Sequence, residues 1–171
     1  AAPGGKAMHA LAKLHGKGSV QARDLTEIKV SLIEENIARC AGAADALEAL
    51  VWDARILDPQ AVEKADVVIA DLPCSGLGVI GRKSDIKYRM TPEQVADIAA
   101  LQREILSVVW QYVKPGGILM YSTCTLTKAE NQDNRDWFLE NSPFTLLEEK
   151  ELLPSAETDG FYMIKCRRNK A

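Results

Sequence analysis

Apolar and polar residues follow one another along the chain in blocks that predict strands and helices in turn. Short apolar runs predict strands at 19–24, 47–52, 67–72 and 117–121. Longer stretches carry apolar residues three or four positions apart and predict helices at 7–15, 26–41, 91–112 and 127–140. Because strands alternate with helices, the pattern predicts an α/β fold with a doubly wound, largely parallel sheet.

Two of the predicted helices begin with the signature of a capping box. Thr91-Pro92-Glu93-Gln94 combines an N-cap threonine, a proline at the first helical position and a glutamine at the third. Thr127-Lys128-Ala129-Glu130 repeats the spacing and predicts a helix that runs to about Glu140. The apolar stripe that follows Thr91 is expected to face the core, and its members are Val95, Ile98, Leu101, Ile105, Val109 and Tyr112.

The last two strands, at 144–149 and 160–168, are joined by a short loop and predict an antiparallel pair. Residues 1–171 are expected to form a single domain, since no repeat, linker or low-complexity tract interrupts the pattern. In a doubly wound sheet the ligand lies outside the carboxyl ends of the strands. The residues at those ends are Asp24, Asp53, Asp71, Cys74 and Cys124.

Composition narrows the class of protein without identifying it. The content of 47% hydrophobic and 26% charged residues is that of an ordinary globular domain. A net charge of −3 argues against a domain that holds nucleic acid by itself, but not against an enzyme whose substrate is delivered by another domain. No apolar run approaches the roughly 20 residues needed to cross a bilayer, so we expect no membrane segment. The cysteines are widely scattered, so we expect reduced thiols and a cytoplasmic location.

The first loop and the first two strand ends suggest a nucleotide-like ligand. Pro3-Gly4-Gly5-Lys6 leads into a helix, and a glycine turn at a helix N-terminus favours a negatively charged group. Asp24 stands where nucleotide-binding sheets place a carboxylate on ribose hydroxyls, and Asp53 could reach an adenine. Each acid alone is as readily a solvated strand end, and the loop is neither a P-loop nor G-x-G-x-x-G.

Two of the four cysteines lie just beyond strand ends, in loops of small polar residues. A zinc pair and a redox pair are weak interpretations of Cys74 and Cys124, because neither C-x-x-C nor histidine spacing supports them. A thiolate nucleophile facing a ligand pocket remains, with Asp71 three residues before Cys74. Cys40 and Cys166 are expected to be ordinary small apolar residues.

The segment between Gly76 and Thr91 is rich in basic residues around Tyr88. It predicts either a solvated loop or a lip that holds a phosphate backbone, and the second interpretation is favoured because the loop leaves the same strand end as Cys74. Its four cations are Arg82, Lys83, Lys87 and Arg89.

Three motifs in this order, "AAPGGK", "DLPCSG" and "STCT", resemble the Sun (Fmu) family of RNA cytosine-5 methyltransferases. The stretch "DLPCSGLGVIGRKSDIKY" is most similar to the bacterial branch that methylates small-subunit ribosomal RNA. The resemblance implies a Rossmann-like methyltransferase sheet and S-adenosylmethionine as methyl donor. It also implies that the donor is bound by Ala1, Ala2, Pro3, Gly4, Gly5, Lys6, Asp24, Asp53 and Asp71.

By the same resemblance, Cys124 is the nucleophile that adds to C6 of cytosine and Cys74 assists product release. Such addition makes C5 enamine-like and able to take a methyl group, with Asp71 on the N3 or amino edge of the base. The target base must be unstacked, which suits a single-stranded or loop cytosine of ribosomal RNA, with no metal.

The sequence departs from the family pattern at a few places. The central first strand and an N-terminal RNA-binding domain, both expected in this branch, do not precede Ala1, so we expect a fragment with two unpaired sheet edges. We expect this piece alone to bind the donor weakly and to turn over little. Gly81 and Ser84 stand where Arg and Pro are commoner, and "KAEN" at 128–131 replaces the usual "PEEN".

Three other functions remain open at this stage. A non-catalytic donor-binding or RNA-scaffold module would need neither cysteine. A nucleotide-dependent oxidoreductase would be expected to carry G-x-G-x-x-G, which is missing. Methylation of another RNA, such as tRNA, would use the same residues.

Overall fold

The computed structural model describes residues 1–39 and 45–170, so Cys40 and the end of the helix predicted at 26–41 lie outside the described residues. The chain forms two compact units, Ala1–Ile56 and Leu57–Ala171. Each unit has its own sheet, and no hydrogen-bonded pair joins the two sheets among the described residues. The single-domain expectation for residues 1–171 therefore stays a prediction.

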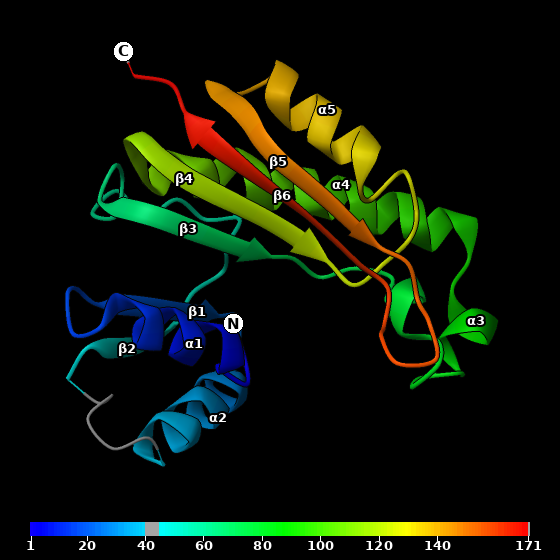
Figure 1. The fold of residues 1–171 in the computed structure, drawn as a ribbon, viewed down its shortest axis with the longest axis horizontal. Helices are drawn as coiled ribbons and strands as arrows, with labels where there is room; N and C mark the ends of the chain where they lie inside the picture. Colours follow the sequence, from blue (N-terminus) through cyan, green and yellow to red (C-terminus); the bar gives the residue numbers. More distant parts are fainter. Residues whose placement is uncertain (40–44, 171) are drawn as a thin grey trace. The chain divides into compact units, whose positions relative to one another are not determined.

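The first unit is a parallel strand pair with two helices (Figure 1). Strand β1 (Val20–Asp24) pairs with β2 (Leu47–Val51), so that Asp24 lies opposite Val51 at their carboxyl ends. Helix α1 (Gly5–Leu14) and helix α2 (Glu27–Ala38) supply side chains to one apolar cluster. Its members are Ala22, Ile33, Ile37 and Leu47, with Met8 and Leu11 packed against them.

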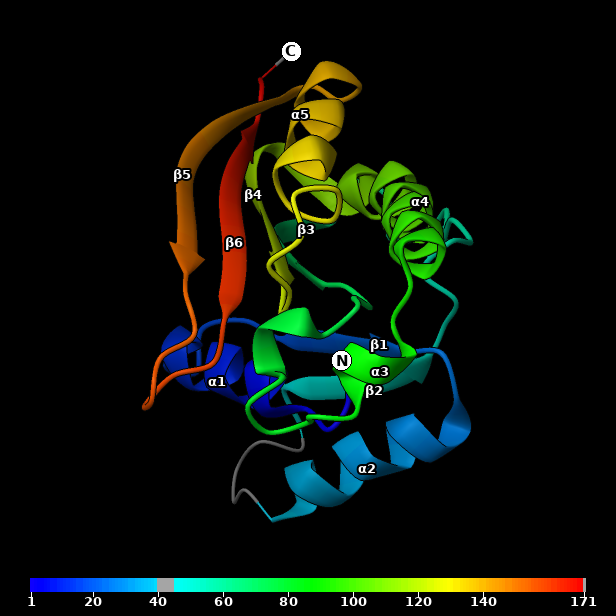
Figure 2. The ribbon, with the colours of Figure 1, turned by 90° about the vertical axis from the view of Figure 1, so that its right-hand side faces the viewer.

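The second unit has a four-stranded sheet in the order β3-β4-β6-β5. Strand β3 (Ala65–Asp71) runs parallel to β4 (Val113–Thr123), and β6 (Phe161–Arg168) is antiparallel to both β4 and β5 (Phe144–Leu152). Figure 2 shows helices α4 (Pro92–Val109) and α5 (Gln132–Glu140) on the same side of this sheet. The short helices η1 (Leu77–Val79), α3 (Ile86–Arg89) and η2 (Trp110–Tyr112) complete the unit.

The predicted fold class is confirmed. The strands and helices alternate along the chain. Strand β1 pairs in parallel with β2, β3 pairs in parallel with β4, and the last two strands form the expected antiparallel pair. Among the described residues each sheet ends in two strands with one unpaired edge, β1 and β2 in the first sheet and β3 and β5 in the second. Val67 and Ile69 on β3 remain 52% and 43% exposed.

One capping box is confirmed and the other is wrong. Thr91 and Gln94 cap α4 reciprocally, and the apolar stripe of α4 is buried or half-buried. Helix α5 instead begins at Gln132, after the N-cap Asn131. Glu130 does not cap this helix, because its fully buried carboxylate binds Thr127 and, far away in the sequence, Ser75 and Gln102.

Candidate active site

Two thiols lie together at the ends of two adjacent strands of the second unit. Cys74 follows β3 and Cys124 follows β4, and these strands pair in parallel up to Asp71 opposite Ser122. The two Sγ atoms are 3.1 Å apart, and the Cys124 backbone N–H donates to Cys74 Sγ at 3.3 Å. Both side chains are half-buried. Parallel pairing therefore brings together the two cysteines that the sequence singled out.

Close backbone contacts fix the loop that carries Cys74. The Gly78 N–H donates to the Cys124 carbonyl at 3.0 Å, and the Gly160 N–H donates to the Gly78 carbonyl at 2.7 Å. A Cβ at position 78 would lie 2.5 Å from the Gly160 oxygen and 2.8 Å from the Cys124 oxygen. Only glycine fits between these carbonyls. The backbones at Gly78, Cys124 and Gly160 therefore come together beside the candidate nucleophile.

The thiol of Cys74 holds its proton firmly. Its hydrogen bond with Cys124, its burial and the charge that Cys124 would carry all raise the pKa of Cys74 well above its ordinary value. At neutral pH Cys74 is therefore a thiol, and it can donate a hydrogen bond to a neighbouring sulfur.

Asp71 ends β3 beside the two thiols. The Ser122 hydroxyl donates to Asp71 Oδ1 at 2.7 Å, which is the bond expected for residues that lie opposite each other in the strand register. The Asp71 side chain is exposed, and its carboxylate can accept hydrogen bonds from an incoming polar group.

A buried polar network lies directly behind the thiols, and sequence reasoning missed it. The residues that follow the two cysteines, Ser75 and Thr125, are joined by a 2.7 Å hydrogen bond between their hydroxyls. Ser75 also binds the carboxylate of Glu130 through both its N–H and its hydroxyl. The only signal in the sequence was the position of Ser75 and Thr125, each one residue beyond a cysteine.

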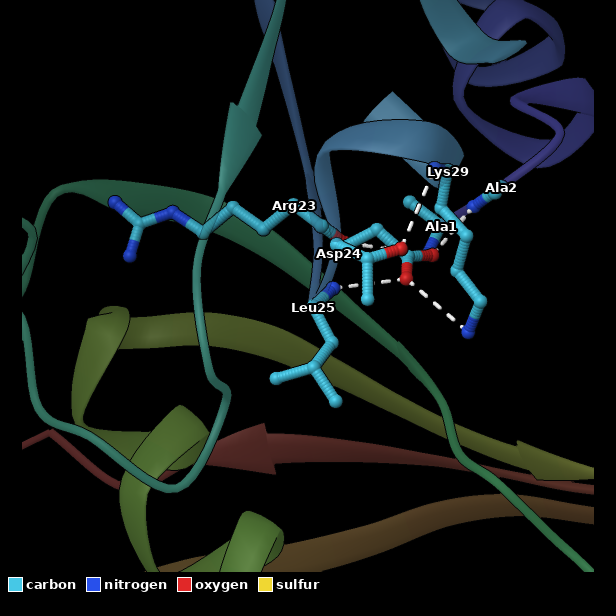
Figure 3. Close-up of polar contacts among 7 residues, drawn as sticks. Ala1, Ala2, Arg23, Asp24, Leu25 and Lys29 are labelled. Carbon is cyan, nitrogen blue, oxygen red and sulfur yellow. Dashed lines mark hydrogen bonds and ion pairs between the residues drawn. The ribbon is translucent and has the colours of Figure 1, made fainter. Parts of the chain in front are cut away.

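In the first unit, Asp24 holds the opening loop (Figure 3). Asp24 Oδ2 accepts from the Ala1 ammonium at 2.6 Å and the Ala2 N–H at 2.8 Å, while Oδ1 accepts from the Leu25 N–H at 2.8 Å. Lys29 Nζ lies 3.4 Å from Oδ1. Burial alone would raise the pKa of Asp24, but these hydrogen bonds outweigh it and hold the pKa well below its usual range.

The predicted glycine turn has the backbone that its sequence suggested. Gly4 has φ of 100°, and a Cβ there would lie 3.2 Å from Ile33 Cγ2. The Pro3 carbonyl accepts from Asn36 Nδ2 at 2.8 Å, which ties the turn to α2. Helix α1 begins at Gly5 without a side-chain cap, so the positive end of its dipole lies at this turn.

Asp53 is already engaged by a neighbour. Arg55 donates to both carboxylate oxygens, with its Nη2 2.7 Å from Asp53 Oδ2. This hydrogen bond lowers the pKa of Asp53 to about 2. The role of Asp53 towards adenine stays a prediction.

The basic segment carries an exposed aromatic ring. Tyr88 is 81% exposed, with Lys87 Nζ 4.8 Å from its ring centroid. Arg82 pairs with Asp159 at 3.1 Å and Arg89 with Asp85 at 3.5 Å, both as exposed side chains. Contact between RNA and Arg82, Lys83, Lys87 or Arg89 stays a prediction.

Within residues 1–39 and 45–170, no three histidine, cysteine, aspartate or glutamate side chains cluster as a metal site would require. In the same ranges, no helix is both long and apolar enough to span a bilayer.

Comparison with known proteins gives a consistent result. A family described as "16S rRNA methyltransferase RsmB/F" matches residues 1–167. Ribosomal RNA small subunit methyltransferase F of Salmonella paratyphi A is 37% identical over 154 residues, which are 90% of this chain and 31% of that protein. Ribosomal RNA small subunit methyltransferase B of Vibrio cholerae is 39% identical over 173 residues, 95% of this chain and 38% of that protein.

Solved structures show the same likeness. The crystal structure of PH0851 has a TM-score of 0.90 at 32% identity, and the match covers 97% of this chain and 40% of that one. NSun6 from Pyrococcus horikoshii, solved with SFG, has a TM-score of 0.83 at 27% identity and matches 100% of this chain and 47% of its own. The chain spans about a third of the length of the curated relatives it matches.

Proposed function

The chain belongs to the RsmB/F family of 16S rRNA methyltransferases, and from this we propose that it carries the catalytic residues of an S-adenosylmethionine-dependent RNA cytosine-5 methyltransferase. The observation that supports the proposal most strongly is the pair of thiols 3.1 Å apart at the ends of two parallel strands. A scaffold module would need neither thiol.

Cys124 is the nucleophile in this proposal. Its thiolate adds to C6 of the cytosine, and the electrons of the C5–C6 double bond move to C5, which then takes the methyl group. A base removes the C5 proton, the double bond re-forms, and the bond between C6 and Cys124 Sγ breaks. S-adenosylmethionine, when bound, supplies the electrophilic methyl group.

Cys74 assists the last step. Its thiol stays protonated at neutral pH and lies 3.1 Å from Cys124 Sγ. A hydrogen bond from Cys74 to the departing thiolate stabilises the charge that develops there, so Cys124 leaves the methylated base more readily. Asp71 is exposed beside the thiols and accepts from the cytosine amino group.

The first unit fits the donor by its chemistry. Asp24 presents a carboxylate for ribose hydroxyls, and one of its partners, Lys29, is 55% exposed and 3.4 Å away, so a hydroxyl can replace it. The turn from Ala1 to Lys6 at the start of α1 suits the donor carboxylate. Asp53 and Asp71 complete the proposed donor set.

The proposed substrate is a flipped cytosine of 16S ribosomal RNA. Arg82, Lys83, Lys87 and Arg89 would contact its phosphates, and the exposed ring of Tyr88 offers a stacking surface. Such a substrate agrees with the expected cytoplasmic location.

The test is methyl transfer to unmethylated 16S rRNA by purified protein that contains this chain. We expect Cys124→Ala to reduce transfer by at least about a thousandfold. We expect Cys74→Ala to accumulate a covalent protein–RNA adduct that resists denaturing electrophoresis. Cys166→Ala removes a buried thiol from β6 and should keep both activity and release. Undiminished transfer by Cys124→Ala would overturn the proposal.

A further inference from the structure

We propose that Glu130 is a positioning residue that holds Cys74 and Cys124 against each other through Ser75 and Thr125; this rests on the proposed function. Glu130 is fully buried. Its Oε1 accepts from the Ser75 and Thr127 hydroxyls at 2.6 and 2.8 Å. Its Oε2 accepts from the Ser75 N–H and Gln102 Nε2 at 2.9 and 3.1 Å.

The carboxylate fixes the direction of the hydrogen bonds between the two cysteine loops. Ser75 has one hydroxyl hydrogen, and a carboxylate can only accept, so Ser75 donates to Glu130. The 2.7 Å bond between Ser75 and Thr125 must then be donated by Thr125. A single chain of donors thus runs from the residue after Cys124, through the residue after Cys74, to Glu130.

Cys74 is held on its other side as well. Gln102 Nε2 donates to the Pro73 carbonyl at 2.8 Å in addition to Glu130. Asn134 Nδ2 donates to Gln102 Oε1 at 2.7 Å, which turns the Gln102 amide so that its NH₂ group faces Pro73. The residues before and after Cys74 are therefore tied to the same buried centre.

The charge of Glu130 has no cationic partner among the described residues, since its four donors are uncharged or backbone groups. Burying a carboxylate is costly unless its acceptors are filled, and here each oxygen accepts two hydrogen bonds. Charge-assisted bonds are shorter and stronger than neutral ones, so the carboxylate holds the loops more rigidly than an amide would.

Two variants test this without removing the packing. Glu130→Gln keeps the size but places an NH₂ group against donors, so the Ser75 hydroxyl must turn and the donor chain must reverse. Thr125→Val is isosteric and cuts the link between the loops. The matched control is Thr123→Val: Thr123 precedes Cys124, is equally buried, and donates to Asn131 instead of to the Ser75–Glu130 chain.

The first measurement does not depend on methyl transfer. Diamide takes one hydrogen from each thiol and is reduced to the hydrazine, while Cys74 and Cys124 form a disulfide. The rate of disulfide formation reports how often the two sulfur atoms come into contact. We expect Glu130→Gln and Thr125→Val to slow this step about tenfold, and Thr123→Val to stay within about threefold of the parent.

The second measurement is the kinetics of methylation. In both test variants kcat should fall about tenfold while KM for RNA stays within about twofold, because the thiols and not the RNA contacts are displaced. Unchanged disulfide formation in folded Glu130→Gln and Thr125→Val overturns the inference, as does an equal loss in Thr123→Val. If both test variants form the disulfide more slowly than the parent, but the parent never methylates RNA, the inference is kept and the proposed function is rejected.

Discussion

Each unit holds its loops with one carboxylate, but the Asp24 carboxylate pairs with a cation whereas the buried Glu130 carboxylate accepts only from uncharged groups. Asp24 in the first unit takes the ammonium group of Lys29 as well as the backbone N–H groups of Ala2 and Leu25 (Figure 3). Glu130 in the second unit is fully buried and takes only uncharged donors. An ionic site near water can exchange a partner for a ligand, whereas a buried site with filled acceptors fixes a geometry. The first suits binding and the second suits the alignment of a nucleophile.

The sharpest way to break this comparison is to truncate both carboxylates. Glu130→Ala removes the acceptor of four hydrogen bonds around a buried centre, so we expect a loss of about 3–5 kcal/mol in the free energy of unfolding. Asp24→Ala should cost only about 1–2 kcal/mol, because water can solvate the groups it leaves. Urea unfolding measures both, and equal losses would contradict the distinction.

A smaller loss of stability is expected at Gly78, where the loops contact one another through backbone atoms alone. Gly78→Ala would place a Cβ 2.5 Å from the Gly160 oxygen, and we expect a loss of about 1–3 kcal/mol. Gly81 lies in the same segment with nothing within 4 Å of an added Cβ, so Gly81→Ala should change stability by less than about 0.5 kcal/mol. Equal unfolding midpoints for the two variants would show that the close contact at Gly78 is not needed.

The units should also differ in their response to pH. The pKa of Asp24 is lowered in the folded chain, so its stabilisation is present above its unfolded pKa of about 4 and is lost as the pH falls. Burial raises the pKa of Cys166 to about 12. Its stabilisation is full below the unfolded thiol pKa of about 8.5 and is lost as the pH rises, by at most about 1.4 kcal/mol per pH unit.

Unfolding at a series of pH values measures this difference. Trp52 reports on the first unit, and Trp110 and Trp137 report on the second. We expect the loss between about pH 9 and 11 to become shallower in Cys166→Ala, and the acid loss to become shallower in Asp24→Asn. An unaltered alkaline slope in Cys166→Ala would contradict the assignment.

Local patterns predicted the elements well and their partners less well. The box at Thr91 caps a helix because both of its side chains find only local partners. At Thr127 the same spacing joins Thr127 to Glu130, but no helix begins there, because the Glu130 carboxylate also binds Ser75, 55 residues away. Spacing alone cannot show a competitor that arrives through the fold. The division into two sheets was not predicted for the same reason: it depends on which strands pair with each other, and the pattern within a single segment does not show that.

The sequence predicted only those residues of the candidate site whose side chains are reactive or charged. Cys74, Cys124 and Asp71 stood out because thiols and carboxylates at strand ends are informative. Ser75, Thr125 and Gln102 are common polar residues, and their importance comes entirely from contacts across long stretches of chain. The engagement of Asp53 by Arg55, only two residues on, is a local contact that the pattern could have indicated.

The most direct test of the catalytic pair is to locate the covalent bond to RNA. The Cys74→Ala protein is incubated with 16S rRNA and S-adenosylmethionine, digested with protease and nuclease, and analysed by mass spectrometry. We predict a methylated cytidine attached to the peptide that contains Cys124. A nucleotide attached to any other residue, or active protein that never forms an adduct, would contradict it.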